Sequence, residues 1–191
     1  MEFPQKNIYL IRHGETEWTK SGQHTGCTDI DLTAAGKIQA ESLGKRIKGH
    51  AFELILCSPM KRAVHTCELT GLFKHAKLEE KLKEWDYGDY EGKTTPEIWK
   101  MSPHWNVFSN GAPNGETLAD IEARTSRLLQ QIAPLHGDVA LFSHGHFLRA
   151  LAAKWLQLRV GDGRLLALSP GSLSILGFER STPVIKLWNS E

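Results

Sequence analysis

Short apolar runs that stop at polar, glycine-containing segments recur along the chain. Three of them predict buried strands: 6–12 (KNIYLIR), 53–57 (ELILC) and 138–143 (DVALFS). Each is short, rich in β-branched or large apolar side chains, and bounded by turn-forming residues, as expected of strands. Residues 172–179 and 183–188 predict a closing pair of strands. These runs are expected to form the central sheet of the fold.

Segments between these runs carry the start and stop signals of helices. Thr33 is a plausible N-cap for a helix that ends at Gly49, because threonine caps helices and glycine commonly follows their last turn. Ser58 followed by Pro59 predicts the start of another helix, which runs to about Phe73. Serine suits the N-cap and proline the first helical position.

Two later segments complete the pattern. Apolar side chains recur at spacings of three and four in residues 117–133, which predicts an amphipathic helix capped by Thr117 or a neighbour. Residues 147–158 are rich in alanine and leucine and predict another helix. Strands that alternate with helices predict an α/β sandwich with a largely parallel sheet, because parallel neighbours need helical crossovers. The chain has no repeat or linker, so residues 1–191 are expected to form a single domain.

Residues 88–116 are weakly periodic and rich in Gly, Pro, Asn and Trp. They predict an elaborated loop with a short helix. Long connections of this kind commonly form lids or binding surfaces, so we expect this one to border the site, with a decorative surface loop as the alternative. Trp85, Trp99 and Trp105 are candidates to line its mouth, although aromatic residues more often pack inside.

The composition excludes several classes of protein. Lys and Arg number 23 against 22 Asp and Glu, a net charge of +1 that removes the usual electrostatic argument for a nucleic-acid or membrane-surface partner. No apolar stretch approaches the roughly 18 residues of a membrane span. Cys27, Cys57 and Cys67 contain no Cys-x-x-Cys pair and support neither a disulfide framework nor a cysteine zinc site. We therefore expect a cytoplasmic protein and leave open a homo-oligomer.

Charged and polar residues follow three of the predicted strands. Arg12 and His13 end the first, Arg62 comes shortly after the second, and His144 follows the third. Because ligands of open α/β sheets bind beyond the carboxyl ends of the strands, these side chains are expected to converge. Arginine forks bind phosphate oxygens, and an imidazole nitrogen can attack phosphorus. The cluster predicts a site for a phosphate monoester that needs no metal.

Simpler explanations exist for each short motif. His144 or His146 could be a satisfied buried histidine, and Arg62 could cover a helix face. The pair His144 and His146 could also suggest a metal, but it has no adjacent carboxylate or cysteine cluster. Residues 88–94 (GDYEGKT) resemble a Walker A loop with three residues between the glycines instead of four. No Gly-x-Ser-x-Gly elbow supports a serine hydrolase.

Six segments, in the same order, resemble the histidine phosphatase, or phosphoglycerate-mutase-like, superfamily. They are LIRHGETEW (10–18), TGCTDIDLTAAG (25–36), CSPMKRAVHT (57–66), KEWDYGDYEG (83–92), NGET (114–117) and SHGHFLR (143–149). The resemblance spans nearly the whole chain. It implies a phosphoglycerate mutase-like fold, a three-layer α/β/α sandwich with a mostly parallel central sheet, and chemistry without a cofactor or metal.

The resemblance implies roles for individual residues. His13 would be the nucleophile that becomes phosphohistidine, with Arg12, Arg62 and His144 completing the phosphate pocket. Glu84 matches the acidic position that acts as proton donor. Such a donor is chemically sensible because the departing alkoxide needs a proton, and the ionised carboxylate can then activate water.

Other matching positions are those where relatives contact the substrate or its phosphate. They are Thr25, Gly26, Tyr87, Gly145 and His146. Thr19 departs from the pattern, because mutase-type relatives usually carry asparagine there, so its phosphate contact is lost or replaced. Gln23 then either supplies a polar contact to the substrate or has only a loop role.

The resemblance leaves the choice of reaction open. Thr95 stands roughly where mutases carry a substrate-binding lysine, and residues 101–115 contain no arginine where mutases have a pair. Charge-assisted hydrogen bonds contribute about 1.5–3 kcal/mol each, so we favour hydrolysis of a small phosphorylated metabolite. Residues 18–33 look like a subgroup acting on sugar bisphosphates, notably sedoheptulose bisphosphate. A cofactor-dependent phosphoglycerate mutase and a non-catalytic phospholigand-binding relative are the alternatives.

Overall fold

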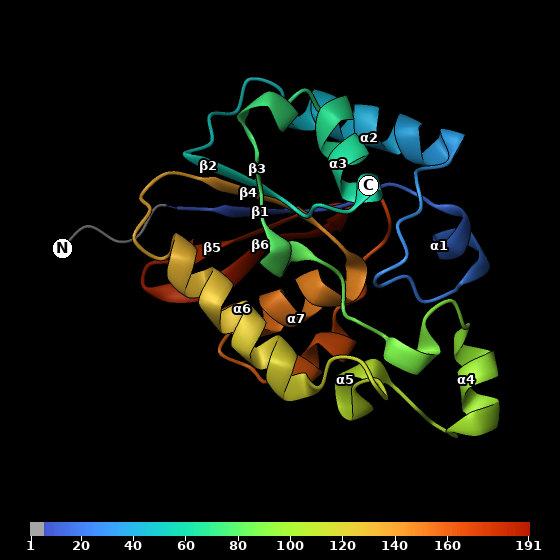
Figure 1. The fold of residues 1–191 in the computed structure, drawn as a ribbon. Coiled ribbons are helices and arrows are strands. Elements are labelled where there is room, and N and C mark those ends of the chain that lie inside the picture. The colour runs from blue at the N-terminus through green and yellow to red at the C-terminus, as the bar shows by residue number, and fades with distance from the viewer. Residues whose placement is uncertain (1–5) are drawn as a thin grey trace.

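A six-stranded sheet with the order β3-β2-β4-β1-β5-β6 organises the computed structural model, which describes residues 6–191 (Figure 1). The strands are β1 Ile8–Arg12, β2 Leu54–Cys57, β3 Lys77–Leu78, β4 Val139–Ser143, β5 Leu173–Glu179 and β6 Thr182–Ser190. Strands β3, β2, β4 and β1 are parallel, whereas β5 and β6 are antiparallel to their neighbours. The expected mostly parallel sheet is therefore confirmed.

Within residues 6–191, seven α-helices surround the sheet. They are α1 Glu17–Ser21, α2 Ala34–Ile47, α3 Lys61–Leu69, α4 Thr95–Met101, α5 Val107–Asn110, α6 Leu118–Ile132 and α7 Gly145–Trp155. Short 3-10 segments lie at Phe73–His75, Glu80–Leu82, Gly88–Tyr90 and Val160–Leu165. Helices α2 and α3 cover one face of the sheet and α6 and α7 the other (Figure 1), which confirms the three layers. Within residues 6–191, no helix combines the length and the apolar character needed to cross a bilayer.

Alternate residues of the central strands belong to two apolar cores. On β4, Leu141 packs in the core shared with α6 and α7, whereas Phe142 packs in the core shared with α2 and α3. All five residues of β4 are buried. A strand that is covered on both faces is expected to be apolar throughout, which is why the run 138–143 has no polar alternation.

The caps predicted for two helices are present. The Thr33 hydroxyl accepts a hydrogen bond from Gly36 N at 3.0 Å and begins α2. Thr117 caps α6 in the same way. The predicted apolar stripe of α6 is buried and includes Ile121 and Leu128.

The helix predicted to begin at Ser58 is wrong at both ends. Helix α3 begins at Lys61, after an N-cap at Met60 that has no side-chain cap, because the Ser58 hydroxyl lies 2.7 Å from His144 Nε2 and accepts only a long bond of 3.4 Å from Met60 N. It ends at Leu69, well before Phe73, and Gly71 has a φ of 80°, which no continuing helix adopts. The site and the turn therefore override the local capping signals.

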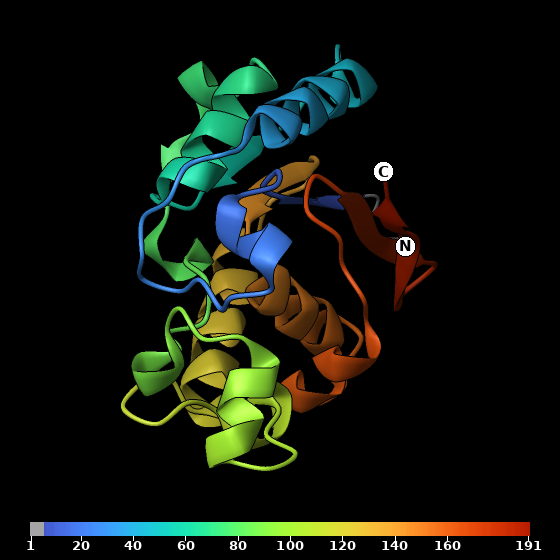
Figure 2. The ribbon, with the colours of Figure 1, turned by 90° about the vertical axis from the view of Figure 1, so that its right-hand side faces the viewer.

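Residues 88–116 contain two helices, α4 and α5, where one was expected. This segment lies beside α1 and the loop that follows it (Figure 2). Gln23 and Thr94 form an isolated β-bridge between the two regions. The long segment is thus tied to the loop after β1. Helix α7 also begins earlier than predicted, at Gly145, so its first turn lies next to the end of β1.

Candidate active site

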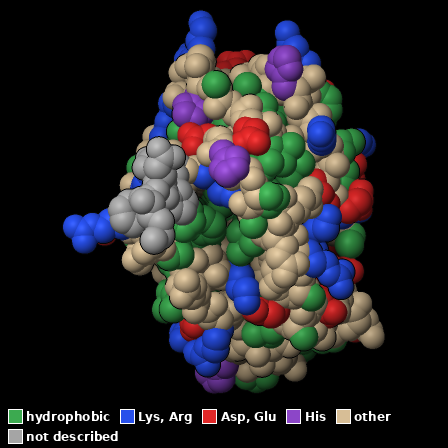
Figure 3. Space-filling model, turned by 90° about the vertical axis from the view of Figure 1, so that its left-hand side faces the viewer, with side chains coloured by type: hydrophobic (Ala, Val, Ile, Leu, Met, Phe, Trp, Pro, Cys, Tyr) green, Lys and Arg blue, Asp and Glu red, His purple; other side chains and the backbone are tan. Residues whose placement is uncertain are grey.

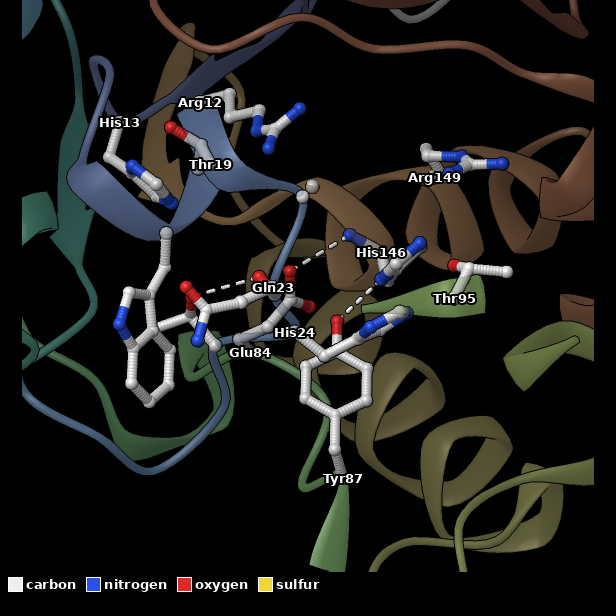
Figure 4. Close-up of a pocket in the computed structure, with 14 residues that line it drawn as sticks. Arg12, His13, Thr19, Gln23, His24, Glu84, Tyr87, Thr95, His146 and Arg149 are labelled. Carbon is white, nitrogen blue, oxygen red and sulfur yellow. Dashed lines mark hydrogen bonds between the residues drawn. The ribbon is translucent and has the colours of Figure 1, made fainter. Parts of the chain in front are cut away.

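A cavity of about 240 Å³ opens at the carboxyl ends of β1 and β4 (Figure 4). Arg12 is the register partner of Ser143 in the parallel pair, so the residues that follow them, His13 and His144, leave the sheet side by side. Their ring centroids are 5.1 Å apart. The parallel pairing therefore brings together two histidines that are 131 positions apart in the sequence.

His13 lines the cavity as a neutral imidazole with a defined tautomer. Its Nδ1 lies 2.8 Å from the carbonyl oxygen of Gly14, which only accepts, so Nδ1 carries the hydrogen and Nε2 carries the free lone pair. Burial lowers the pKa of His13 well below its usual value, and the charges of Arg62 and Arg12 lower it further. An unprotonated Nε2 is the form that can act as a nucleophile.

Arg12 brings a partly unsatisfied guanidinium to the cavity. Its Nη1 donates to the carbonyl of Leu168, but its buried Nε has no hydrogen-bond partner among residues 6–191. Burial lowers the pKa of Arg12 to about 10, so the group stays charged at neutral pH. A buried donor without a partner costs about 1–3 kcal/mol, and an anionic ligand can relieve that cost.

Gly145 allows the Arg12 guanidinium to lie against the first turn of α7. A Cβ atom at Gly145 would lie 3.0 Å from Arg12 Cζ. That distance is shorter than packed carbon atoms prefer. The absence of a side chain at Gly145 therefore leaves the space that the Arg12 guanidinium occupies.

Arg62 lies behind the cavity wall. Its Nη atoms donate to three carbonyl groups of residues 25–28 at 2.9–3.1 Å, and its Nε donates to His144 Nδ1 at 3.1 Å. Arg62 thus supports the loop that carries Thr25, one of the cavity-lining residues. Its charge also acts on the neighbouring His13 ring.

Both ring nitrogens of His144 bind protein groups. Nδ1 accepts from Arg62, so Nε2 carries the hydrogen and donates to Ser58 Oγ at 2.7 Å. Burial lowers the pKa of His144 well below its usual value, and the Arg62 charge adds to this effect. The ring is fully buried beside His13.

Glu84 lies in the cavity wall with its carboxylate at the N-terminus of α7. Its two oxygens accept hydrogen bonds from the backbone N–H groups of His146 at 3.0 Å and Phe147 at 2.8 Å. The N–H of Trp85 donates to it as well, at 2.9 Å. A negative group is stabilised at a helix N-terminus, and the three bonds fix its orientation.

His146 and His24 line the wall away from His13. The Tyr87 hydroxyl and His146 Nδ1 lie within hydrogen-bond distance of each other, so Nε2 is the ring nitrogen that His146 has left for a ligand. His24 Nδ1 donates to the Lys93 carbonyl at 2.9 Å, which leaves its Nε2 as an acceptor.

The protonation of these groups follows from their surroundings. Burial lowers the pKa of both histidines, and burial together with the Glu84 charge raises the pKa of Tyr87 well above its usual value. This wall therefore offers two neutral imidazole rings, of which His24 presents its Nε2 as an acceptor. The two imidazole rings are nearly parallel, 13° apart, with centroids 5.9 Å apart.

Thr19 and Gln23 line the cavity, but their polar atoms form hydrogen bonds to other groups of the protein. The Thr19 hydroxyl accepts from Thr16 N at 2.8 Å and donates to Thr16 O at 2.9 Å. Gln23 donates to Gly92 O at 2.8 Å and accepts from the Ser21 hydroxyl. The bonds between Thr16 and Thr19 cap the start of α1, and the bond from Gln23 to Gly92 joins the loop after α1 to residues 88–116.

Thr25 and Gly26 follow in the same loop. Thr25 lines the cavity and is buried. A Cβ atom on Gly26 would lie 2.5 Å from the carbonyl oxygen of Trp85, so only glycine fits there. Gly26 therefore permits the loop to pack against the segment that carries Glu84.

Sequence reasoning missed four cavity residues: Trp18, Gly22, His24 and Arg149. Arg149 lies one helical turn after Gly145 on α7, so spacing along the helix was the signal that could have found it. Its guanidinium stacks over Phe108 at 4.5 Å and donates to the Gly163 carbonyl.

The tryptophans proposed for the mouth do not line the cavity. Trp85 and Trp105 are buried in the core, and Trp99 lies half exposed on α4. Their apolar rings contribute to packing. Trp18, from the loop side, is the tryptophan in the cavity wall.

In the part of the chain that the structure describes, His, Cys, Asp and Glu side chains nowhere gather in a group of three or more that could hold a metal ion. His144 binds Ser58 and Arg62, whereas His146 binds Tyr87, so the two histidines have separate partners.

Comparison with known proteins identifies the family of the chain. Residues 8–191 match the histidine phosphatase superfamily (branch 1). An acid phosphatase of Mycobacterium tuberculosis is 40% identical over 177 residues, which cover 90% of this chain and 86% of that protein. Sedoheptulose 1,7-bisphosphatase of Saccharomyces cerevisiae is 37% identical over 183 residues, 79% and 68% of the two chains. The solved structure of an open reading frame from Mycobacterium tuberculosis superposes with a TM-score of 0.93 and 36% identity over 97% of both chains.

Proposed function

Because the chain belongs to the histidine phosphatase superfamily and is a phosphatase, we propose that it hydrolyses small phosphate monoesters with His13 as the nucleophile. The observation that carries the proposal is the neutral His13 ring beside the unpartnered Nε of Arg12. The first group can form a bond to phosphorus and the second can bind a phosphate oxygen.

The reaction has two steps. His13 Nε2 attacks phosphorus, the bond from phosphorus to the ester oxygen breaks, and Glu84 gives that oxygen a proton. Water then attacks the phosphohistidine, Glu84 takes a proton from the water, the bond from phosphorus to His13 Nε2 breaks, and inorganic phosphate leaves. Arg12 stabilises the negative charge on the phosphoryl oxygens in both steps.

Sugar phosphates or bisphosphates are the proposed substrates. The neighbouring Nε2 atoms of His146 and His24 suit hydroxyl groups, which both donate and accept. Arg149 adds a second cation to the same cavity, on α7. It supports a substrate with a second anionic group, and one relative is named a sugar bisphosphatase.

Thr95 supports hydrolysis over isomerisation. It lines the cavity roughly where mutases carry a substrate-binding lysine. A neutral hydroxyl there gives a carboxylate-bearing substrate no charge-assisted bond. An efficient mutase is therefore disfavoured.

Phosphate release from a panel of mono- and bisphosphorylated sugars, with a chelator present, tests the reaction. We expect an acid-labile phosphoenzyme whose phosphorus resonance shows attachment at Nε2 of His13. His13→Ala should lose both turnover and phosphoenzyme, a fall of at least about 10⁴-fold, because the covalent route is removed. The exposed histidine variant His75→Ala is the matched control.

Three results would contradict the proposal. Undiminished turnover by His13→Ala would exclude this nucleophile. Tight binding of the sugars without phosphate release would favour a binding protein. Efficient conversion of 3-phosphoglycerate to its 2-isomer after priming with bisphosphoglycerate would favour a mutase.

A further inference from the structure

Arg124 of α6 holds the backbone of the segment that carries Glu84. Its Nη1 donates to the carbonyl oxygens of Lys81, at 3.0 Å, and of Lys83. Its Nη2 donates to the carbonyl oxygen of Glu84 itself at 3.3 Å. The Arg124 side chain is 14% exposed, so these bonds are largely shielded from water. One guanidinium therefore fixes the chain on the N-terminal side of the Glu84 carboxyl group.

Glu116 completes the support on the other side. Its two carboxylate oxygens accept from Arg124 Nε at 2.9 Å and Nη2 at 2.6 Å, a bidentate pair. The same carboxylate accepts from Asp86 N at 2.9 Å, and the Glu116 carbonyl accepts from Trp85 Nε1 at 2.9 Å. The pair thus binds the residues immediately before and after Glu84.

Arg124 also contacts the helix end that anchors the carboxylate. Its guanidinium carbon lies 4.3 Å above the ring of Phe147. The backbone N–H of Phe147 is one of the donors to Glu84, at 2.8 Å. Both supports of Glu84, its own backbone and the first turn of α7, therefore rest on Arg124.

We propose that Arg124 and Glu116 are positioning residues that aim the Glu84 carboxyl group at the leaving-group oxygen. The inference rests on the proton-donor role given to Glu84 in the proposed function. Neither residue lines the cavity, so each acts through Glu84. Only a planar fork can bind a carboxylate through two atoms while donating to three carbonyl groups, so lysine is not equivalent at position 124.

Leaving-group dependence separates positioning from mere stability. A p-nitrophenyl leaving group departs without a proton, whereas the alkoxide of fructose 1,6-bisphosphate needs one. We compare kcat/KM, which covers the steps up to the first phosphoryl transfer. Arg124→Gln should lower it about 30-fold for fructose 1,6-bisphosphate and less than about threefold for p-nitrophenyl phosphate, as expected when only general-acid catalysis is weakened.

Two further variants keep the experiment decisive. Glu116→Gln retains the side-chain shape and one acceptor, so it should show the same selectivity with a smaller loss, even where Arg124→Gln folds poorly. Arg127→Gln is the matched control, because Arg127 is exposed on the same helix. It should leave both substrates unaffected.

The double variant of Arg124→Gln with Glu84→Gln completes the test. If Arg124 acts through Glu84, the double variant loses no more activity toward fructose 1,6-bisphosphate than Glu84→Gln does alone. Equal losses on both substrates, or additive losses in the double variant, would overturn the positioning role. If Glu84→Gln itself shows no leaving-group dependence, the proposed role of Glu84 fails, and this inference fails with it.

Discussion

The polar groups at the two ends of the parallel strands differ in how completely they are hydrogen-bonded within the protein. At the carboxyl ends, neutral histidines surround a cavity and Arg12 keeps a buried donor without a partner. At the amino ends, Asp138 accepts from Asn7 N at 2.7 Å and lies 2.8 Å from His50 Nε2. Figure 3 shows the face on that side, where histidine, acidic, basic and apolar side chains are interspersed.

This contrast separates binding from stability. Groups that satisfy one another, such as Asn7 and Asp138, stabilise the fold and have nothing left to bind. Groups with unmet hydrogen-bonding capacity, such as Arg12 Nε, add little stability and are available to a ligand. Substitutions at the two ends should therefore change different measurements.

The largest effect is expected from Arg12→Gln. It removes the charge and the unpartnered donor, and charge-assisted bonds contribute about 1.5–3 kcal/mol each, so kcat/KM should fall about 100-fold. The free energy of unfolding, measured in urea, should change by less than about 1 kcal/mol, because the lost bonds are mainly those to substrate. A large loss of stability with little loss of activity would reverse the comparison.

Gly145→Ala should have an intermediate effect. The new methyl group would lie 3.0 Å from Arg12 Cζ and push the guanidinium away from its position. A displacement of this kind is expected to lower kcat/KM about 10-fold. Because alanine favours helices over glycine, thermal unfolding should show no loss of stability. Wild-type kinetics in this variant would show that Arg12 has room to move.

Asp138→Asn should have the smallest effect on activity and act on stability alone. Burial by itself would raise the pKa of Asp138, but hydrogen bonds from Asn7 and His50 outweigh it and hold the pKa below the usual 3.8. A lowered pKa stabilises the fold above pH 3.8, and this contribution is lost as the pH falls below that value.

Urea unfolding of the Asp138→Asn variant at several pH values checks this expectation. The variant should be about 1–2 kcal/mol less stable at neutral pH, because a charged acceptor is lost. The difference should shrink below pH 3.8, while kcat/KM at neutral pH stays unchanged. A constant difference down to pH 3 would show that the Asp138 charge is not the source.

The sequence was sufficient for features that depend on local pattern. Short apolar runs located five of the six strands in residues 6–191, all but β3, and Thr33 and Thr117 identified two helix starts. Spacing relative to strand ends placed His13 and His144 at the same edge of a sheet, and their rings do meet there. These features follow from neighbours in the chain or from the rules of parallel sheets.

Features that depend on distant partners were missed. Ser58 has the residue type of a cap, but His144, 86 positions away, binds its hydroxyl. Arg62 was expected in the phosphate pocket, and its observed bonds run to the loop 25–28. Arg149 was overlooked because the helix was predicted to begin at residue 147, so Gly145 and Arg149 were not placed on one helix face. Tertiary contacts determine which partners these side chains bind.

The placement of β1 between β4 and β5 also affects how the protein matures. Ile8 pairs with Val139 on one side and with Leu176 on the other. The ribosome synthesises both partner strands long after β1, so β1 cannot pair until most of the chain has been made. Pairings between such distant segments slow folding. A nascent chain that ends before residue 173 lacks β5, one of the two strands that pair with β1, and we expect it to have no catalytic activity. Catalytic competence should therefore arise late in translation and all at once.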